Sequence, residues 1–388
     1  MPHVVHIGFF SDPTERSPAA LLEAWPTLVD VAEAASRAGI GVSVVQMSAH
    51  TERLQHRGVA YYFLPFGATP AALLRNAALG TLLRTLAPDV LHVHGLCFPR
   101  EVLALAALVP QCPIVLQDHA NAVPRVWRRA VHRRALSLAA GLAFCALEQA
   151  RPFTRARLVS AQMPLYEVPE ATSRFVPGEQ IAARRLTGIS GDPAVLWVGH
   201  LNSNKDPLTV LDGISAAARD LPRLRLYCCF GTAPLLREVR HRIGTDPQLR
   251  ERVQLLGRVE HERVELLMRA ADLFVLGSHR EGSGYSLIEA LACGLPPVVT
   301  DIPSFRTLTG RGSVGMLWPP SDATALRDAL RSAAAHATPA TRAAVRAHFE
   351  RELSFAALGA KLRAMYTDVL ARRHGDRLAP PPLAAAAS

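Results

Sequence analysis

Long hydrophobic runs are missing from this chain of 388 residues. A membrane-spanning helix needs about 18 or more consecutive apolar residues. The nearest approach, residues 102–116, is interrupted by Pro110, Gln111 and Pro113. The first residues, MPHVVHIGFFSDP, also lack the basic segment and apolar run of a secretory signal. We therefore expect a globular, cytoplasmic protein, and the length favours two or three domains.

The chain also lacks closely spaced cysteines, and it contains few lysines. The six cysteines show no C-x-x-C spacing and stand in apolar surroundings, so we expect buried, reduced thiols rather than disulfides or a zinc site. Only Lys205 and Lys361 are lysines, and every other fixed cation is arginine. The net charge of +10 is shared by both halves without a basic tail. Phosphorylated substrates, an anionic membrane surface or no specific partner at all could each explain this charge, and no nucleic-acid partner is expected.

The most informative stretch is residues 273–302, LFVLGSHREGSGYSLIEALACGLPPVVTDI. Leu273–Leu276 has the length and character of a buried parallel strand, and a loop with two glycines follows it. Tyr285–Cys293 has a helical pattern that ends at Gly294, a typical C-terminal cap. Strand, glycine-rich turn, helix and strand form a βαβ unit whose turn directs backbone N–H groups toward a ligand.

Two carboxylates make this turn more specific. Glu281 stands in the loop, and Glu289 follows eight residues later in the helix. If a phosphate binds at the helix N-terminus, Glu289 can accept hydrogen bonds from vicinal sugar hydroxyls while Glu281 faces the other side of the ligand. Otherwise Glu281 caps the helix and Glu289 is a solvated surface residue. The spacing alone does not separate these alternatives.

The pattern E-G-S-G-Y-S-L-I-E-A-L-A-C-G-L-P-P-V-V resembles the retaining nucleotide-sugar glycosyltransferases of family 4 (group 1), with their E-x7-E signature. The resemblance implies a GT-B fold, in which two doubly wound Rossmann-like domains face a central cleft. It implies a catalytic role for Glu281. It also places further residues of this stretch in the donor site: Gly282, Gly284, Tyr285, Ser286 and Glu289.

Two other segments extend the resemblance. V-G-H-L-N-S-N-K is similar to the family's V-G-R-L-x3-K, whose Arg and Lys hold the donor diphosphate. Lys205 matches, whereas His200 replaces the Arg and makes that contact neutral or pH-dependent. Gly257, Arg258 and Val259 match the segment where relatives hold the base through backbone groups. Because these groups would meet the diphosphate charge, the resemblance predicts no cofactor and no metal.

The N-terminal half alternates strands and helices, beginning with a strand at residues 3–9. The loop at residues 11–18 has no glycine, unlike the family, which argues against a donor contact there. His92 and His94 lie on one face of a later strand. They could form the metal site of an H-x-H metal hydrolase, which is a competing hypothesis, or simply hydrogen-bond to neighbouring loops. His119 follows the next strand, and the resemblance implies that it lies near the reacting sugar and acceptor.

Residues 125–134 (RVWRRAVHRR) start a strongly basic helix. A solvated helix face is the simplest interpretation, and peripheral contact with an anionic membrane or a phosphorylated acceptor is the alternative. Either interpretation of this helix predicts a cytoplasmic protein. The second interpretation adds peripheral contact with the inner face of the membrane.

Taken together, the sequence predicts a retaining glycosyltransferase that uses a nucleotide diphosphate sugar and an unidentified acceptor. A non-catalytic subunit that binds the nucleotide sugar is the alternative, since His200 and the first loop depart from the family. The predicted division is an acceptor-side domain at 1–168, a linker at 169–192, a donor domain at 193–350, a helix at 351–374 that packs back on the first domain, and a disordered tail at 375–388.

Overall fold

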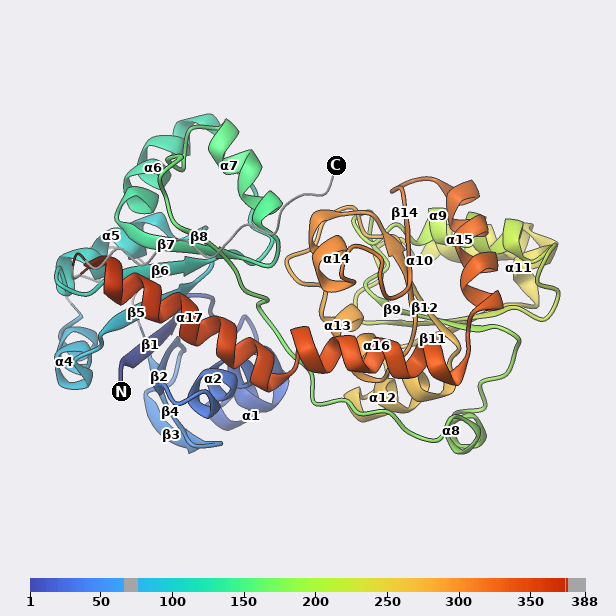
Figure 1. Ribbon diagram of the computed structural model, residues 1–388, viewed down its shortest axis with the longest axis horizontal. Helices are drawn as coiled ribbons and strands as arrows, with labels where there is room; N and C mark the ends of the chain where they lie inside the picture. The colour runs from blue at the N-terminus through green and yellow to red at the C-terminus, as the bar shows by residue number, and fades with distance from the viewer. Residues whose placement is uncertain (66–75, 374, 376–388) are drawn as a thin grey trace. The chain divides into compact units, whose positions relative to one another are not determined.

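The computed structural model describes residues 1–65, 76–373 and 375, and it divides the chain into two compact units. The first unit holds residues 1–170 and the chain from Leu358 onward, and the second holds residues 171–357. Each unit is built on a mainly parallel β-sheet with helices on both faces (Figure 1). The predicted fold class of two doubly wound α/β domains is confirmed.

Strands and helices alternate along most of the first unit. Its elements are β1 (His3–Gly8), α1 (Pro18–Ala24), α2 (Pro26–Arg37), β2 (Gly41–Met47), β3 (Glu52–His56), β4 (Val59–Leu64), α4 (Ala77–Leu86), β5 (Val90–His94), α5 (Pro99–Leu108), β6 (Ile114–Gln117), η1 (Val126–Arg128), α6 (Arg129–Ser137), β7 (Ala139–Phe144), η2 (Leu147–Ala150), α7 (Arg151–Arg155), β8 (Leu165–Glu167) and α17 (Phe355–Arg373).

The first sheet has the strand order β3-β4-β2-β1-β5-β6-β7-β8, and only β3 is antiparallel to its neighbour. The order reverses direction between β1 and β5, which is the switch point where doubly wound sheets bind ligands. The register pairs His6 with His92 and Gly8 with His94. Histidines from two strands therefore meet at this switch point.

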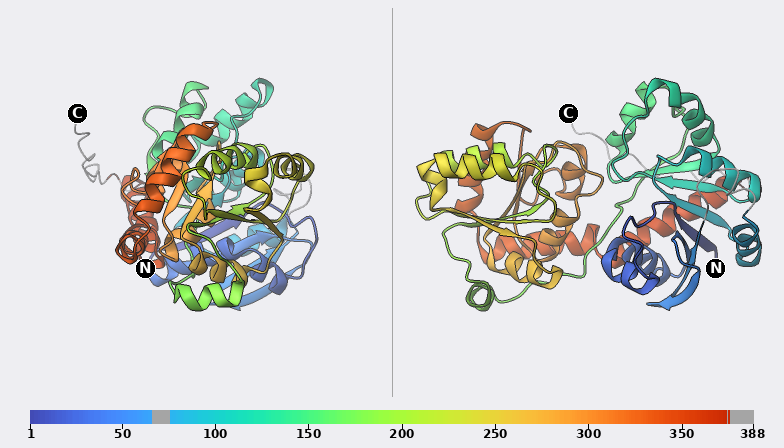
Figure 2. Two further views of the ribbon diagram at one scale, coloured as in Figure 1. Left: turned by 90° about the vertical axis from the view of Figure 1, so that its right-hand side faces the viewer. Right: turned by 180° about the vertical axis from the view of Figure 1, so that it is seen from behind.

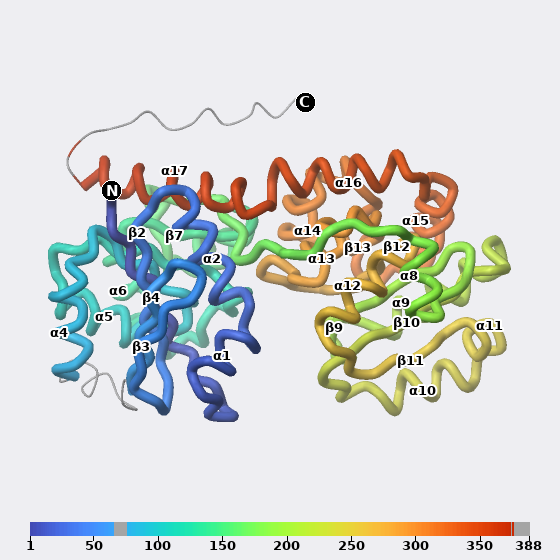
Figure 3. The backbone as a smooth tube through the Cα atoms, turned by 90° about the horizontal axis from the view of Figure 1, so that it is seen from below, coloured from blue at the N-terminus to red at the C-terminus, as the bar shows by residue number. Residues whose placement is uncertain are grey.

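Helix α17 packs on the first unit, along one face of its sheet (Figures 1 and 3). Gly359 permits this approach, because a Cβ at this position would lie 2.4 Å from the backbone oxygen of Ala34 in α2. Further along the helix, Tyr366 is fully buried and its hydroxyl contacts His6 and His92. The helix thus places a phenol at the carboxyl ends of β1 and β5.

The second unit repeats the same alternation. Its elements are α8 (Gln180–Thr187), β9 (Ala194–Gly199), α9 (Pro207–Ala217), β10 (Arg225–Phe230), α10 (Leu236–Thr245), α11 (Pro247–Arg250), β11 (Val253–Gly257), α12 (His261–Ala270), β12 (Leu273–Leu276), α13 (Tyr285–Ala292), β13 (Pro297–Thr300), α14 (Pro303–Leu308), β14 (Met316–Trp318), α15 (Ala323–Ala335) and α16 (Pro339–Glu352).

The second sheet is parallel, with the strand order β11-β10-β9-β12-β13-β14 and helices on both sides (Figure 2). Its central strands are buried on both faces, which explains why β12 and β13 read as continuous apolar runs. The switch point lies between β9 and β12. The loops that follow these two strands carry Lys205 and Glu281.

Several predicted boundaries differ from the structure. The segment expected to be a linker, 169–192, contains α8, whose Gln180 and Arg184 hydrogen-bond to Asp272 within the second unit. The two edge strands of the first sheet, β3 and β8, were not predicted from the sequence. The returning helix joins the first unit at Leu358 rather than at residue 351. Apart from Gly375, the tail predicted at 375–388 lies outside the described residues.

No helix in the described ranges combines the length and the apolar character required to cross a bilayer. The six cysteines are unpaired thiols. Cys145, Cys228, Cys229 and Cys293 are buried as expected. Cys112 is half-buried and Cys97, in the loop before α5, is exposed, which corrects the prediction that all six are buried.

Candidate functional site

Lys205 and Glu281 form an ion pair at the switch point of the second sheet. The Lys205 Nζ lies 2.5 Å from Oε1 of Glu281, and each side chain is 13% exposed. Lys205 follows β9 and Glu281 follows β12, so adjacent strands bring together two residues that are 76 positions apart. The sequence predicted separate roles for these residues but not their contact.

Backbone and side-chain hydrogen bonds fix the two loops against each other. The backbone N–H of His279 donates to the backbone oxygen of Asn204 at 2.8 Å, and the Asn204 amide donates to the backbone oxygen of Arg280 at 2.9 Å. The imidazole of His279 also lies 3.1 Å from a carboxylate oxygen of Asp206, which caps α9. These contacts hold the ammonium group of Lys205 at a defined position before any ligand binds.

His200 stands beside this pair as a neutral hydrogen-bond acceptor. The backbone N–H of Thr232 donates to His200 Nδ1 at 3.1 Å. Partial burial, and then the positive charge of Lys205, lower the pKa of His200, although Glu281 opposes the shift. Of the two options that the sequence left open, this environment favours the neutral imidazole at pH 7.

A cavity of about 360 Å³ opens at the carboxyl ends of β9, β10 and β11. It brings together three predicted donor-site residues, His200, Arg258 and Val259. Gly257 directly precedes Arg258, and its φ of 72° is a conformation that favours glycine and turns the chain into this loop. The cavity is lined by Val198, Gly199, His200, Cys229, Phe230, Gly231, Thr232, Arg258, Val259 and Val264.

The glycine-rich turn leads directly into α13, as predicted. Gly284 is the N-cap residue with a φ of 69°, and a Cβ there would lie 2.6 Å from the Phe305 ring. Gly282 and Ser283 are buried, whereas Tyr285 is exposed and Ser286 is half-buried. Only glycine satisfies both the backbone conformation and the close packing at position 284.

Glu289 has a partner that sequence analysis missed. Its Oε1 lies 2.7 Å from Nε2 of His261, the first residue of α12. Because α12 also contributes Val264 to the cavity, Glu289 is held close to the β11–α12 loop. A pairing of residues 28 positions apart on two different helices leaves no local sequence signal.

In the first unit, His119 forms an ion-pair contact with Glu170. Nδ1 of His119 meets Oε2 of Glu170, and the imidazole is 30% exposed while the carboxylate is buried. Burial alone would lower the pKa of His119, but the Glu170 carboxylate and its hydrogen bond, together with Asp118, raise it overall. The sequence did not predict this contact, because no local pattern links the loop after β6 to the segment after β8.

Three other histidines lie beside His119. One ring nitrogen from each of His6, His92 and His94 falls within 4.8 Å of the others, a separation from which a metal could be bound. Burial lowers the pKa of all three, that of His6 to about 3, so they are neutral at pH 7. His94 hydrogen-bonds to His6 and to His119, each at 3.2 Å. These hydrogen bonds occupy both nitrogens of His94 without a metal.

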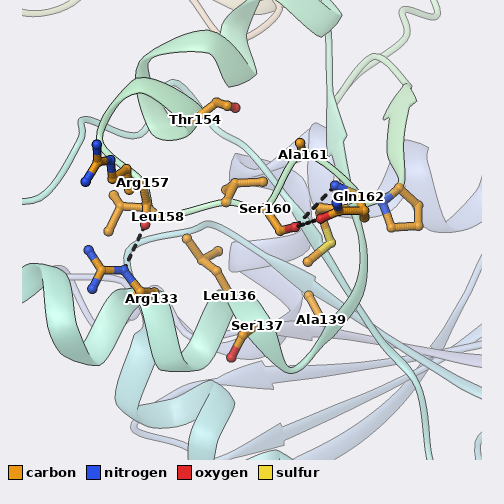
Figure 4. A pocket seen from close by; sticks show the side chains of 13 residues that line it. Arg133, Leu136, Ser137, Ala139, Thr154, Arg157, Leu158, Ser160, Ala161 and Gln162 are labelled. Carbon is orange, nitrogen blue, oxygen red and sulfur yellow. Dashed lines mark hydrogen bonds between the residues drawn. The ribbon is translucent and has the colours of Figure 1, made fainter.

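A larger cavity, of about 620 Å³, lies elsewhere in the first unit, between α6, α7 and the loop before β8 (Figure 4). Arg133 and Arg157 lie together at one side, where Nε of Arg133 donates to the backbone oxygen of Arg157 at 2.8 Å. Ala139, the first residue of β7, lines this cavity, which therefore lies at the amino ends of the strands, whereas His94 lies at their carboxyl ends. None of the predicted catalytic or donor residues lines this cavity.

Comparison with known proteins agrees with this arrangement. Residues 180–347, which include the Lys205–Glu281 pair and the neighbouring cavity, match the family described as glycosyl transferases group 1. The chain is also similar to a GDP-mannose:cellobiosyl-diphosphopolyprenol alpha-mannosyltransferase from Xanthomonas oryzae, with 26% identity over 74% of this chain and 71% of that protein.

Solved structures match almost the whole chain. The sucrose-phosphate synthase of Thermosynechococcus elongatus superposes with a TM-score of 0.72 at 18% identity, covering 96% of this chain and 100% of its own. The Anabaena protein HepE, in complex with UDP and glucose, gives a TM-score of 0.67 at 16% identity over 95% of this chain and 100% of its own. The chain is therefore a glycosyltransferase with the GT-B fold, and its residues 180–347 form a group 1 glycosyl transferase domain.

Proposed function

We propose that this protein transfers a sugar from a nucleotide diphosphate sugar to an acceptor, with retention of the anomeric configuration. The observation that carries the proposal is the Lys205–Glu281 pair at the switch point of the second sheet, next to a cavity lined by His200, Arg258 and Val259. HepE, which shares the fold, was solved with UDP and glucose, and this supports a nucleotide-sugar donor.

The second unit offers one group for each part of such a donor. The base would occupy the cavity, and the carboxylate of Glu289 would accept hydrogen bonds from the ribose hydroxyls. Lys205 and the first backbone N–H groups of α13 would meet the diphosphate, because a helix N-terminus and an ammonium both favour anions.

Glu281 would act on the sugar end of the donor. Its ion pair with Lys205 holds the carboxylate close to the leaving diphosphate, where it can accept a hydrogen bond from a sugar hydroxyl. His119 of the first unit is proposed to contact the reacting sugar or the acceptor, with Glu170 fixing the imidazole. Retention follows from the resemblance to family 4, and no carboxylate is assigned as a covalent nucleophile.

Turnover is expected to be independent of divalent metals, because Lys205 and the α13 N-terminus supply the positive charge that the leaving diphosphate requires. The purified protein should release nucleoside diphosphate slowly from its donor in a panel of nucleotide sugars, with EDTA present or absent.

Two results would contradict this expectation. Loss of turnover in EDTA with recovery on adding one divalent metal would overturn the account of the leaving group. Donor binding without any hydrolysis or transfer, across a broad acceptor panel, would favour the non-catalytic nucleotide-sugar-binding subunit instead.

We also propose peripheral contact of η1 and α6 with an anionic membrane surface. Val126 and Trp127 are 71% and 72% exposed, and the guanidinium of Arg125 lies 5.3 Å from the centre of the Trp127 ring. Exposed aromatic and aliphatic groups beside arginines are the combination that binds lipid interfaces. The relative from Xanthomonas, whose name includes a diphosphopolyprenol acceptor, makes a lipid-linked acceptor the first class to test.

Binding to vesicles should therefore depend on acidic lipid. We expect the protein to sediment with phosphatidylserine-containing vesicles and not with neutral ones. Replacing Arg125 with Ala should weaken binding about five-fold, the effect of roughly 1 kcal/mol per basic residue near such a surface. Arg237→Ala is the matched control, because it removes the same charge from a side chain that is 93% exposed but lies in α10 of the second unit. Equal losses for the two variants would exclude the surface.

A further inference from the structure

An unbroken series of hydrogen bonds leads from His119 into the interior of the first unit. Nε2 of His119 contacts Nδ1 of His94 at 3.2 Å, and Nε2 of His94 contacts Nδ1 of His6 at 3.2 Å. Nε2 of His6 then lies 3.0 Å from the Tyr366 hydroxyl, which lies 2.6 Å from Nδ1 of His92. We call this series the histidine–tyrosine chain; its members are His119, His94, His6, Tyr366 and His92.

The two ends of this chain are acceptors. At the outer end, Nδ1 of His119 meets the carboxylate of Glu170, which can only accept when ionised. At the inner end, Nε2 of His92 and Oε1 of Gln117 are buried without a hydrogen bond of normal geometry. The Gln117 side chain nevertheless favours a proton on His92 through a side-chain hydrogen bond. Gln117 is therefore the acceptor that a protonated Nε2 of His92 would use.

Counting protons fixes the direction of the chain when every imidazole is neutral. The carboxylate of Glu170 accepts a hydrogen bond from the single N–H of neutral His119, so this proton is on Nδ1. Nε2 of His119 must then accept from Nδ1–H of His94. For the same reason, Nε2 of His94 must accept from Nδ1–H of His6. All four histidines carry their proton on Nδ1 in this state, Tyr366 donates to His6, and Nε2 of His92 is bare.

Adding one proton to His119 reverses the chain. His119 then donates from both nitrogens, so Nδ1 of His94 must accept and its proton must move to Nε2. His6 changes in the same way, Tyr366 turns its hydroxyl toward His92, and Nε2 of His92 gains a proton and can donate a hydrogen bond to Oε1 of Gln117. Every hydrogen bond is kept in both states, which matters because an unpaired buried donor is costly.

We propose that His94, His6, Tyr366 and His92 are positioning residues that determine which nitrogens of His119 carry protons, by reversing their hydrogen bonds together. The significance of this reversal for catalysis rests on the function proposed above for His119. The reversal itself is a property of the protein without ligand and can be tested separately. A group that contacts substrate could thereby gain or lose a proton while every buried N–H and O–H donor of the histidine–tyrosine chain keeps an acceptor.

Charges around His119 support two accessible protonation states. Glu170 and Asp118 favour the protonated form, while burial opposes it, and the net effect is a raised pKa. His94 contacts this ring from β5, and His92 stacks on His94 with the ring centres 4.5 Å apart. Both remain neutral, since burial and the neighbouring histidines lower their pKa. The added proton therefore stays on His119, and only the tautomers of the inner residues change.

The test is nitrogen NMR of ring-labelled histidines in the untagged full chain, titrated from acidic to alkaline pH. On the alkaline side of the His119 titration, His119, His94, His6 and His92 should all show the Nδ1–H tautomer. On the acidic side, His94, His6 and His92 should switch to Nε2–H together. Mixed tautomers, or inner histidines that do not follow His119, would overturn the proposal without bearing on transferase activity.

Tyr366→Phe removes one hydroxyl and interrupts the hydrogen bonds of the histidine–tyrosine chain. Nε2–H of His6 would then have no acceptor in the reversed state, so the pKa of His119 should fall by about one to two units, and its tautomer should no longer be coupled to that of His92. Tyr166→Phe is the matched control, because the Tyr166 hydroxyl donates to Asp368 of the same helix at 2.6 Å, outside the chain.

Two outcomes would contradict the proposed coupling within the histidine–tyrosine chain. An unchanged pKa of His119 in Tyr366→Phe, or an equal shift in Tyr166→Phe, would show that the contacts are only structural. Ring-nitrogen signals that change on adding EDTA would show that His6, His92 and His94 hold a metal ion instead. The tautomers of the unmodified protein decide the question even if a variant fails to fold.

Discussion

Replacing Lys205 with alanine is expected to cause the largest loss of donor affinity. A lost hydrogen bond to a charged group costs about 1.5–3 kcal/mol, or roughly a 10- to 150-fold increase in Kd for the nucleoside diphosphate. The structure adds a second effect, because Glu281 loses the partner that lies 2.5 Å away. An unpaired carboxylate beside a diphosphate repels it, so the loss should reach the upper part of this range.

The Glu281 contribution can be isolated by a double-mutant cycle. If Glu281 repels the ligand once Lys205 is gone, adding Glu281→Gln to Lys205→Ala should recover part of the affinity. Calorimetry with the nucleoside diphosphate and with the nucleoside alone measures both effects. The nucleoside should bind equally to all variants, since its base and ribose are held elsewhere.

Lys361→Ala is the natural control, because Lys361 is the other lysine of the chain and lies in α17. It removes the same charge from the protein without touching the second sheet. If Lys205→Ala weakens the nucleoside as much as the nucleotide, or if Lys361→Ala has the same effect, Lys205 does not hold the diphosphate.

Replacing Glu289 with alanine is the second change with a large expected effect. A carboxylate can accept from both the 2′ and the 3′ hydroxyl of a ribose, and each lost charged hydrogen bond should cost about 1.5–3 kcal/mol. The side chain is held by His261 at 2.7 Å, so the geometry for such a contact exists before the ligand arrives. The fold should be unaffected, because Glu289 is only half-buried.

A comparison between ligands separates ribose contact from general damage. The parent protein should bind the 2′-deoxy nucleotide clearly more weakly than the ribonucleotide, and Glu289→Ala should hardly distinguish them. His261→Ala provides the internal control, since it loosens Glu289 but keeps the carboxylate, and it should retain most of the discrimination. Equal discrimination by the parent and Glu289→Ala would mean that the E-x7-E motif has been misassigned.

Much of the second unit was determined by local sequence. The apolar run Leu273–Leu276, the helical period that follows and the cap at Gly294 predicted β12 and α13 almost to the residue. Gly284 has a φ of 69°, and a Cβ there would lie 2.6 Å from the Phe305 ring, so both the turn and the packing behind it require glycine. Such features are encoded within about twenty residues, because hydrogen bonding within a helix and alternation along a strand are local.

Weak or irregular segments were predicted less well. The segment 169–192 was expected to be a linker because prolines and glycines interrupt its pattern, yet α8 packs on the second unit through Gln180 and Arg184. The short strands β3 and β8 lie at the two edges of the first sheet and carry mixed burial patterns. Their structure depends on a neighbouring strand rather than on their own composition.

The partners of the site residues were decided only by the tertiary structure. Sequence alone selected Lys205, Glu281, Glu289 and His119 by motif, but it could not show that Lys205 pairs with Glu281. The order of strands places the loops after β9 and β12 side by side although 76 residues separate the pair. In the same way, Tyr366 reaches His92 across 274 residues because α17 returns to the first unit. The sequence thus determined which chemical groups are present, whereas their pairing and protonation depend on long-range packing that no local pattern encodes.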